Sequence, residues 1–588
     1  MATKTRGTRG RNAKTAPKNG AAKTAKGMRK SGAKNTRGTQ ARAMLKGSTR
    51  GNGAMKRAAA KPIVSKTPRF TYANLTFTEQ DHGIYDAAVG HFREQLGEHY
   101  KNVINGALVG SQDGKEIEHA SPADTRLIVS YFPRGTSEDA VEAIRAAKLA
   151  SNEWGRSSYQ ERVDILRKAA DLMYERAWEA AAIMAYEVGK PRGEGIAEVY
   201  EAAELIRYYC DAIEQNKGYV YELTPPGKNQ RTRSVLLPYG VFAVISPWNF
   251  PLALLTGMSS GALIAGNTVI AKPASESPVS AWFLYNCLND AGLPVGAFNL
   301  VVGPGGTVGE ELRKNPMVDG IAFTGSYDVG MFLYKNFATE YPKPVIAEMG
   351  GKNPVIITEN ADLDLAAEGV VRGAFGFSGQ KCSATSRVYV AESVKGDFLD
   401  RLVDFASQRV KVGFPTERET FMGPVMNRNA VNTWQKAVDD TIAAGGRVVY
   451  GGNQIKDGDL QYGYYVEPTV VDNLTPDHRV FKEELFVPFL AVQEIDSVED
   501  GVELANDVKF GLTAGIYSQD PREVEYFYNN IQAGVTYSNR RAGATTGAWP
   551  QNNTFGGWKG SGSTGHNAFG PHYLQHFMRE QSRWIVEE

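Results

Sequence analysis

The sequence predicts an α/β protein with two successive domains, each built on a parallel β-sheet, and a disordered basic tail before them. Three observations carry this prediction. Strand and helix patterns alternate from Val241 onwards, a second series of strands begins after Val345, and the first 68 residues contain almost no large apolar side chain. Strands separated by helical stretches of about 10–15 residues are typical of βαβ units. A chain of 588 residues is long enough for two or three domains.

The N-terminal segment differs in charge from the rest of the chain. Residues 1–69 hold 20 of the 66 Lys and Arg and no Asp or Glu, which leaves 46 basic against 65 acidic residues, about −19, in 70–588. We predict that 1–68 is disordered, because it cannot bury enough apolar surface to offset its ordering entropy. Three roles stay open for it: a solubilising tail, a segment that binds nucleic acid through phosphate contacts, or a mitochondrial transit peptide.

Folded sequence is predicted from Phe70. The stretch from Thr136 to about Cys210 is helical, because apolar residues recur at helical spacing in 137–154 and again in 162–184. After Gly218 the pattern changes to β-branched apolar runs. The first series of strands is VFAVIS, NTVIAKP, FNLVVG and GIAFTGS, with helices predicted at 253–265, 279–291 and 308–314. The second series is PVIIT, SRVYVA, RVVYGG and AGIYS.

Cysteine content and hydropathy exclude several classes of protein. Cys210, Cys287 and Cys382 stand far apart and form no CxxC pair, so neither a disulfide framework nor a zinc ribbon is indicated, and no metal site is predicted. No apolar run reaches the roughly 18 residues that span a membrane. We therefore predict a reducing compartment, the cytoplasm, or the mitochondrial matrix if the tail is a transit peptide.

Cys382 is the first candidate for a catalytic group. It lies in GFSGQKCSATSR (376–387), a turn of small residues before an apolar strand, with Lys381 beside it. Glu348 lies in AEMGGKNP (347–354), another glycine-rich turn after a strand. A lone cysteine is more often an inert buried thiol, but a nucleophile needs an accessible thiol of lowered pKa with a base nearby, which this context favours.

Turns between strands and helices supply the other candidates. SPWNFP (246–251) follows a strand, and Asn249 in it either caps the next helix or donates its amide to a developing oxyanion. GPGGTVG (303–309) and FTGS (323–326) place free backbone N–H groups where an anion can bind. Neither matches the GxGxxG dinucleotide fingerprint.

The motifs SPWNFP, GNTVIAKPA, FTGS, EMGGKNP, GQKCSA and KEELFVP together resemble the aldehyde dehydrogenase superfamily in order and context. The resemblance runs from about residue 70 to the C-terminus. It implies an aldehyde dehydrogenase-like fold with a Rossmann-like NAD(P)-binding domain over 69–350 and a catalytic domain over 351–564. An oligomerisation β-hairpin at about 219–238 and a C-terminal oligomerisation segment over 565–588 are expected to make a homo-oligomer, a dimer or larger.

The resemblance also implies a mechanism. Cys382 attacks the aldehyde, and Asn249 with the Cys382 backbone N–H holds the oxyanion of the thiohemiacetal. Hydride transfer to NAD or NADP leaves a thioester, and Glu348 activates the water that hydrolyses it. The positions that match the family's cofactor contacts are Ser246, Trp248, Lys272, Ser275, Gly305, Gly309, Ser326, Glu484 and Phe486.

Two positions depart from the family pattern. Ser275 stands where many NAD-preferring members have a Glu that binds the adenosine ribose, and Glu276 comes one residue later. NADP is therefore expected to be tolerated or preferred. The usual FGP after Glu484 reads Phe486-Val487-Pro488. Because Val lacks the backbone freedom of Gly, altered local geometry is expected there.

Within the superfamily the chain is most similar to the 1-pyrroline-5-carboxylate dehydrogenase branch, which oxidises L-glutamate γ-semialdehyde to glutamate in proline degradation. Segments 186–209, 364–387 and 545–562 carry this similarity. It implies that Ser383 and the backbone of Gly547 and Ala548 anchor the substrate carboxylate, although 547–548 can also be read as an ordinary loop.

The substrate stays open on two grounds. NRRAGATTGA (539–548) is longer than the branch's own link, and EMGGKNP is the generic superfamily form. Succinic and α-ketoglutaric semialdehydes, which also carry a carboxylate, are therefore alternatives. A hypothesis of another class is a nucleic-acid-associated protein that acts through the basic tail.

Overall fold

The structure is a computed structural model that describes residues 70–543, 549–550 and 552–587. All described residues belong to one unit, Thr67–Glu588. The predicted basic tail lies outside the described residues, and so do Gly547 and Ala548. No helix in the described part of the chain is both long and apolar enough to cross a lipid bilayer.

The N-terminal part of the unit is mainly helical, as the sequence predicts. A capping box starts the second helix: the Thr136 side chain accepts from the Asp139 backbone N–H at 3.2 Å, and the Asp139 carboxylate accepts from the Thr136 N–H at 2.8 Å. A small sheet of β1 (Glu98–His99), β5 (Ile128–Pro133) and β4 (Glu116–Ala120) interrupts the helices. The helices are α1 (Glu79–Arg93), α2 (Ser137–Trp154), α3 (Tyr159–Glu175), α4 (Ala177–Glu187) and α5 (Arg192–Gln215).

The first large sheet has seven strands in the order β12-β11-β8-β9-β10-β2-β3. The first five strands in this order, β12 to β10, are parallel to one another. At the other end, β2 is antiparallel to β10 and β3 is antiparallel to β2. The antiparallel edge differs from the expected all-parallel sheet, and its cause is local. Asn105 and Gly106 both have positive φ (52° and 72°), and an Asn-Gly pair in this conformation makes a tight hairpin. The bounds are β2 (Asn102–Ile104), β3 (Ala107–Val109), β8 (Val241–Ile245), β9 (Thr268–Lys272), β10 (Phe298–Leu300), β11 (Gly320–Thr324) and β12 (Val345–Glu348).

The second large sheet also has seven strands, in the order β15-β16-β17-β14-β13-β19-β20. Only β15, at its edge, is antiparallel to its neighbour among the described strands. The chain passes from the first sheet to the second between Glu348 and Asn353. The bounds are β13 (Asn353–Ile357), β14 (Thr385–Ala391), β15 (Arg447–Tyr450), β16 (Thr469–Asp472), β17 (Phe489–Ile495), β19 (Thr513–Tyr517) and β20 (Val535–Ser538).

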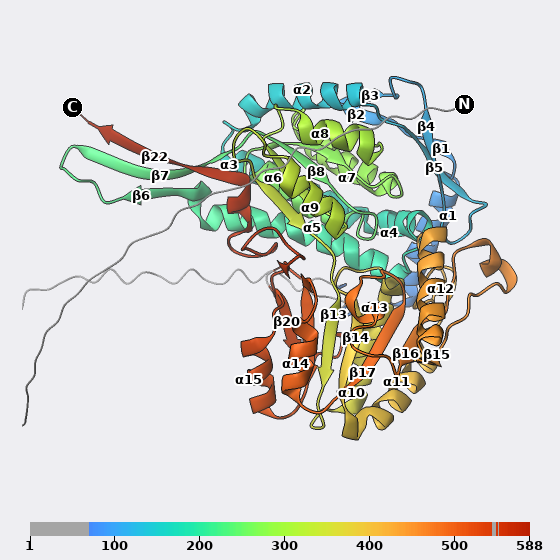
Figure 1. Ribbon diagram of the computed structural model, residues 1–588. Helices are drawn as coiled ribbons and strands as arrows, with labels where there is room; N and C mark the ends of the chain where they lie inside the picture. Colours follow the sequence, from blue (N-terminus) through green and yellow to red (C-terminus); the bar gives the residue numbers. More distant parts are fainter. Residues whose placement is uncertain (1–69, 544–548, 551, 588) are drawn as a thin grey trace, which may run out of the picture. The chain divides into compact units, whose positions relative to one another are not determined.

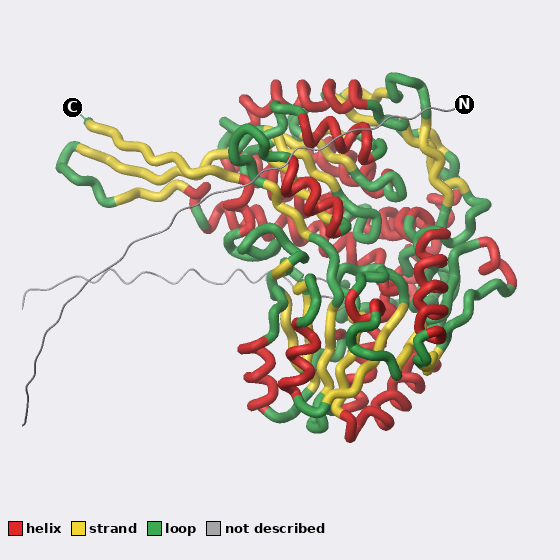
Figure 2. Tube along the Cα trace, in the orientation of Figure 1, coloured by secondary structure: helices red, strands yellow, loops and turns green. Residues whose placement is uncertain are grey.

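Helices cover both faces of each large sheet (Figure 2). Alternate residues of one strand enter different cores: Phe242 and Val244 pack with one cluster and Val241 and Ala243 with another. This two-residue period is that of a strand buried on both sides, which explains the continuous apolar runs in the sequence. The remaining helices are α6 (Ala253–Ile264), α7 (Pro278–Ala291), α8 (Glu310–Lys314), α9 (Tyr327–Asn336), α10 (Leu363–Phe375), α11 (Lys395–Arg409), α12 (Arg428–Ala443), α13 (Arg479–Lys482), α14 (Val498–Asn506) and α15 (Pro521–Asn530).

A three-stranded antiparallel sheet extends away from the first large sheet (Figure 1). It consists of β6 (Val220–Leu223), β7 (Gln230–Pro238) and β22 (Met578–Val586), so that the C-terminal strand pairs with the hairpin predicted at about 219–238. The predicted α/β class, with two sheet domains and an additional β-hairpin, is confirmed. The roles of the individual domains stay predictions.

Candidate active site

The candidate residues meet where two sheet edges face each other. Asn249, Ser326 and Glu348 follow or end strands β8, β11 and β12, and the ends of parallel strands lie along one edge of a sheet. Cys382 and Glu484 precede strands β14 and β17 of the second sheet. A cavity of about 220 Å³ is lined from both sheets, by Pro247, Trp248, Asn249, Thr324, Gly325, Ser326, Met349, Gly350, Cys382, Glu484 and Phe486.

A second, narrower cavity reaches the same cysteine. Its volume is about 40 Å³, and most of its lining is apolar or aromatic, with Glu201 and Glu348 as its carboxylates. Cys382 and Met349 line both cavities, so the thiol stands between them. The aromatic lining comes from residues that the sequence reasoning missed, namely Tyr209, Phe323, Phe555, Phe569 and Tyr573.

Asn353 holds the turn that carries Cys382. Its side-chain amide donates to the main-chain oxygens of Cys382 (2.7 Å) and Ala384 (2.9 Å), and its Oδ1 accepts from the Thr513 N–H at 3.0 Å. The residues before the cysteine, Phe377 to Gly379, all have positive φ, between 48° and 65°. Backbone strain of this kind is characteristic of functional sites. The sequence reasoning did not identify Asn353, although it stands in the same EMGGKNP motif as Glu348.

The environment of the Cys382 thiol favours its neutral form. Burial raises the pKa of the thiol to about 12, and the carboxylates of Glu484 and Glu348 add to the shift, while the backbone N–H groups of Ser383 and Cys382 act against it. This result differs from the expected lowering of the thiol pKa. Lys381, which was expected to help, is fully buried and donates to both carboxylate oxygens of Glu194, each at 2.8 Å.

Glu348 is a half-buried residue whose carboxyl group accepts a hydrogen bond from the backbone. Its Oε2 accepts from the Gly557 N–H at 3.2 Å. Burial raises the pKa of Glu348 to about 8, because the charged form loses its hydration. A carboxyl group with a pKa near neutrality can take a proton and return it at physiological pH, which is what a general base requires.

Asn249 is 4% exposed and lines the larger cavity together with Cys382. Its Nδ2 donates to the main-chain oxygen of Gln380 at 3.0 Å, so the amide is directed at the turn that carries the cysteine. This position is compatible with the expected oxyanion donor. It does not support a simple helix cap by Asn249, because its amide donates to Gln380, while the N–H groups of Leu252 and Ala253 at the start of α6 donate to Glu198.

The predicted cofactor positions other than Glu484 and Phe486 lie along the carboxyl edge of the first sheet. The Ser246 N–H donates to the main-chain oxygen of Lys272 at 3.2 Å, and a Cβ added at Gly309 would lie 3.8 Å from the Lys272 side chain. Gly305 opens a π-helical turn before α8, and Ser326 is the N-cap residue of α9. Ser275 follows β9 and is half-buried.

This edge fits an anionic dinucleotide. The buried Ser246 hydroxyl has no hydrogen-bond partner among the described residues, and space is open beside Gly305 and Gly306. Burial lowers the pKa of Lys272, and among the described residues its ammonium donates only to the Pro273 oxygen, at 3.4 Å. An anion beside these groups would supply the missing partners.

Glu484 and Phe486 lie across the larger cavity from this edge. Glu484 accepts from the Gly351 N–H at 2.9 Å, and burial raises its pKa to about 7. The left-handed residue of this turn is Phe486 (φ 58°), and Val487 is not among the described residues with positive φ, so its backbone does not need the freedom of a glycine. Phe486 packs edge-on against Trp248, with ring centroids 5.7 Å apart.

The predicted carboxylate anchor is described only in part. Ser383 is buried next to Cys382 but does not belong to the lining of either cavity. Gly547 and Ala548 lie outside the described residues. The structure adds Glu201 to the site: it lines the narrow cavity, accepts from the Tyr72 hydroxyl at 2.7 Å and has a pKa raised to about 8 by burial.

Two large sheets with a cysteine between their facing edges, flanked by an amide and a carboxyl group and beside an edge that fits an anionic dinucleotide, have the arrangement of a dinucleotide-dependent dehydrogenase. Comparison with known proteins makes the assignment specific. The chain belongs to the aldehyde dehydrogenase family, whose family model matches residues 108–582. It is an oxidoreductase that acts on aldehydes.

Three relatives illustrate the similarity. The chain is 37% identical over 464 residues to α-ketoglutaric semialdehyde dehydrogenase of Bacillus subtilis, covering 79% of this chain and 93% of the relative. It is 37% identical over 507 residues to 1-pyrroline-5-carboxylate dehydrogenase of Geobacillus kaustophilus, covering 85% and 95%. A crystal structure of 1-pyrroline-5-carboxylate dehydrogenase from Thermus with bound NAD has a TM-score of 0.82 and 34% identity, covering 87% and 97%.

Proposed function

We propose that this chain oxidises L-glutamate γ-semialdehyde to L-glutamate, with NAD as the hydride acceptor and Cys382 as the nucleophile. The observation that carries the proposal is the position of Cys382 between two cavities, one lined by Asn249 and Glu484 and the other by Glu348 and Glu201. The relatives that bear the name 1-pyrroline-5-carboxylate dehydrogenase support the choice of substrate.

The chemistry begins with the thiol. Cys382 Sγ gives its proton to solvent water, the thiolate bonds to the aldehyde carbon, and the π electron pair of the carbonyl moves to its oxygen, which becomes an oxyanion. Asn249 Nδ2 and the Cys382 N–H donate to that oxygen, which concentrates their stabilisation where negative charge develops. When bound, NAD supplies the hydride acceptor, and loss of hydride from the carbon turns the adduct into a thioester. The residues that would hold NAD are Ser246, Trp248, Lys272, Ser275, Gly305, Gly309, Ser326, Glu484 and Phe486.

Hydrolysis of the thioester completes the cycle. Glu348 takes a proton from water, the hydroxide adds to the thioester carbon, and the Cys382 thiolate leaves. The thiolate then takes up the proton held by Glu348, and the product acid gives its own proton to solvent. The pKa of Glu348, raised to about 8 by burial, makes it a stronger base than an exposed carboxylate once it is ionised.

Glu201 supports an amino-acid semialdehyde as substrate. The two candidates suggested by the relatives differ at one carbon, which bears an ammonium in L-glutamate γ-semialdehyde and a keto oxygen in α-ketoglutaric semialdehyde. A buried carboxyl group in the narrow cavity favours the ammonium, because a cation would repay the cost of ionising Glu201 there. Ser383, Gly547 and Ala548 remain our proposal for the carboxylate anchor.

NAD rather than NADP is favoured by Glu276. Its carboxylate is close enough to Lys272 to act on the pKa of the lysine. A negative charge at this position repels the 2′-phosphate of NADP, so Glu276 compensates for the missing Glu at Ser275.

Substrate choice is tested with purified full-length chain and three aldehydes. We expect kcat/KM for L-glutamate γ-semialdehyde to exceed that for α-ketoglutaric and succinic semialdehydes at least about 10-fold, the scale of one buried charged contact. NADH formation measures the rate, and parallel assays with NADP measure cofactor preference. The Glu201→Gln variant should lower the ratio of kcat/KM for L-glutamate γ-semialdehyde to kcat/KM for α-ketoglutaric semialdehyde. A higher kcat/KM for α-ketoglutaric semialdehyde would overturn the substrate proposal while leaving the dehydrogenase mechanism intact.

We also propose that the sheet of β6, β7 and β22 binds a second copy of this chain. Every residue from Arg579 to Val586 of β22 is exposed, and large apolar side chains stand on the sheet, with Trp584 65% and Val586 68% exposed. Exposed apolar strands with free edges are costly in water unless another chain covers them.

Sedimentation velocity of the full chain tests this interface. We expect a dimer or larger species for the wild type and a shift toward smaller species for Val586→Asp, because a buried charge opposes association. Leu149→Asp is the matched control, since Leu149 is an exposed leucine (80%) on α2, outside the sheet. A monomeric wild type would contradict the proposal.

A further inference from the structure

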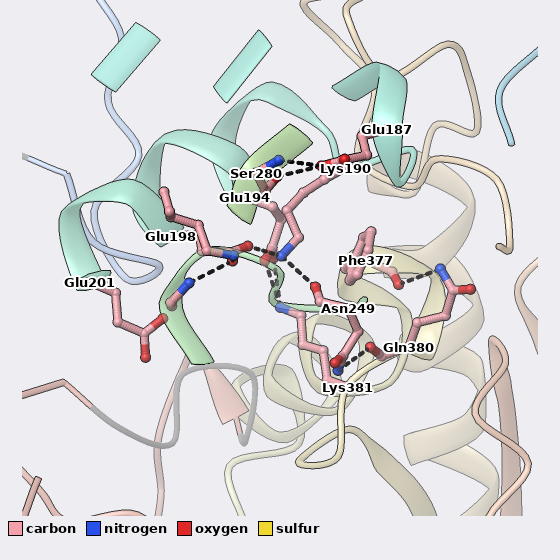
Figure 3. Close-up of polar contacts among 12 residues, drawn as sticks. Glu187, Lys190, Glu194, Glu198, Glu201, Asn249, Ser280, Phe377, Gln380 and Lys381 are labelled. Atoms are coloured by element: carbon pink, nitrogen blue, oxygen red, sulfur yellow. Dashed lines mark hydrogen bonds and ion pairs between the residues drawn. The ribbon is translucent and has the colours of Figure 1, made fainter. Parts of the chain in front are cut away.

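A buried ion pair lies behind Asn249 and has no part in the mechanism above. Lys190 and Glu198 are in direct contact, and the side chains of both are 0% exposed. Lys190 stands two residues before α5, and Glu198 lies within that helix. Figure 3 shows the lysine between the carboxylate and the loop that carries Asn249.

Lys190 also binds the main chain of Asn249. Its Nζ donates to the Asn249 oxygen at 2.7 Å and lies over the rings of Phe250 and Phe377, 3.8 Å and 4.4 Å from their centroids. The side-chain amide of Asn249 donates to the main-chain oxygen of Gln380. Asn249 is thus fixed at its backbone by one contact and directed at the cysteine turn by another.

Glu198 fixes the residues that follow. Its Oε1 accepts from the N–H groups of Leu252 (2.9 Å) and Ala253 (3.1 Å), where α6 begins. A carboxylate at a helix N-terminus satisfies otherwise unpaired N–H groups and interacts favourably with the helix dipole. The lysine and the glutamate therefore hold the whole turn from Asn249 to Ala253.

A comparison with another capped helix of the chain separates helix capping by Glu198 from the contact that Lys190 makes with Asn249. Glu187 caps α7 in the same manner, by accepting from Val279 and Ser280, and it makes no ion pair among the described residues. Capping therefore needs only the carboxylate. A fully buried ion pair gains little net stability, because each charge loses several kcal/mol of hydration. The distinctive contact of the pair is the one to Asn249.

We propose that Lys190 and Glu198 are positioning residues for the oxyanion site. They fix the backbone of Asn249 so that its amide already faces the developing charge and need not reorganise during attack. This inference rests on the proposed function, in which Asn249 is the oxyanion donor.

The test compares Lys190→Met, the double variant Lys190→Met/Glu198→Gln, and the matched control Glu187→Gln. We expect kcat for the aldehyde to fall about 10²-fold in both Lys190 variants, the effect of a misplaced reacting group, with KM little changed. Alkylation of Cys382 by iodoacetamide should keep its wild-type rate, because that reaction forms no oxyanion. Glu187→Gln should keep its kcat.

Thermal unfolding separates positioning from stability. Lys190→Met leaves Glu198 without its cation and should lower the unfolding midpoint, whereas the double variant should recover much of it. If kcat recovers together with the midpoint, or if alkylation slows as much as turnover, the positioning role is wrong. The double variant decides the question should Lys190→Met fail to fold. Unchanged turnover in Asn249→Ala would instead overturn the oxyanion role in the proposed function.

Discussion

Replacement of Cys382 by Ala is expected to lower aldehyde turnover about 10⁴-fold or more, because no other group in the site can form the thioester. Cys382 is among the residues that line both cavities, and Asn353 fixes the turn that carries it. NADH formation at saturating aldehyde and cofactor measures the loss.

The matched control is Cys287→Ala. Cys287 is fully buried in α7, and its pKa is likewise raised to about 12 by burial, so the substitution removes a similar thiol away from the site. It should retain turnover. Comparable activity in Cys382→Ala would contradict covalent catalysis at this residue.

Glu348→Gln is expected to lower the steady-state rate about 10²- to 10⁴-fold by blocking hydrolysis of the thioester. The first turnover should persist, because the thioester forms before Glu348 is needed. Stopped-flow recording should then show a rapid transient of NADH equal to the enzyme concentration, followed by a slow phase. Mass spectrometry of the intact chain should show the acyl group on Cys382.

The matched variant is Glu201→Gln, which removes the other carboxyl group lining the narrow cavity, whose pKa is also raised to about 8. It should show no transient. If Glu201→Gln gives the transient and Glu348→Gln does not, the base has been assigned to the wrong carboxylate. Loss of the transient in Glu348→Gln would assign Glu348 to activation of the thiol.

The raised pKa of Glu348 has opposite consequences for rate and stability. Its ionised form is the base, so the hydrolysis-limited rate should rise with pH up to about 8. Its neutral form is favoured by folding, because the folded pKa of about 8 exceeds the ordinary value of 4.5. The associated stability is complete below pH 4.5 and is lost as pH rises through about 8. Denaturant titrations of wild type and Glu348→Gln should diverge in this window, the variant losing less stability.

Local patterns were sufficient for most of the fold. The helix over 137–154 and the apolar runs of β8 and β13 depend on residues close in sequence, and the structure forms them as expected. One local signal was missed. Asn105-Gly106 makes the hairpin of β2 and β3 and sets an antiparallel edge on the first sheet.

These local patterns do not predict which partner a side chain contacts. Lys381 is adjacent to Cys382 in sequence, but its ammonium binds Glu194, a residue of α5. The expected lowering of the thiol pKa failed for the same reason, because burial and two carboxylates outweigh the backbone donors. The sequence did not indicate Asn353 and Lys190 as site residues. Asn353 binds Cys382, 29 residues away in sequence, and Lys190 binds Asn249, 59 residues away.

The sequence by itself determined the α/β class, the family, and the order of the turns that bear Asn249, Glu348 and Cys382, since strand and helix periods and motif order are properties of contiguous residues. The tertiary structure alone decided that these turns meet between two sheet edges, and that Lys190, Glu198 and Asn353 hold them there. The physical reason is that burial, pKa and hydrogen-bond partners arise from contacts between distant segments, which exist only once both sheets are packed.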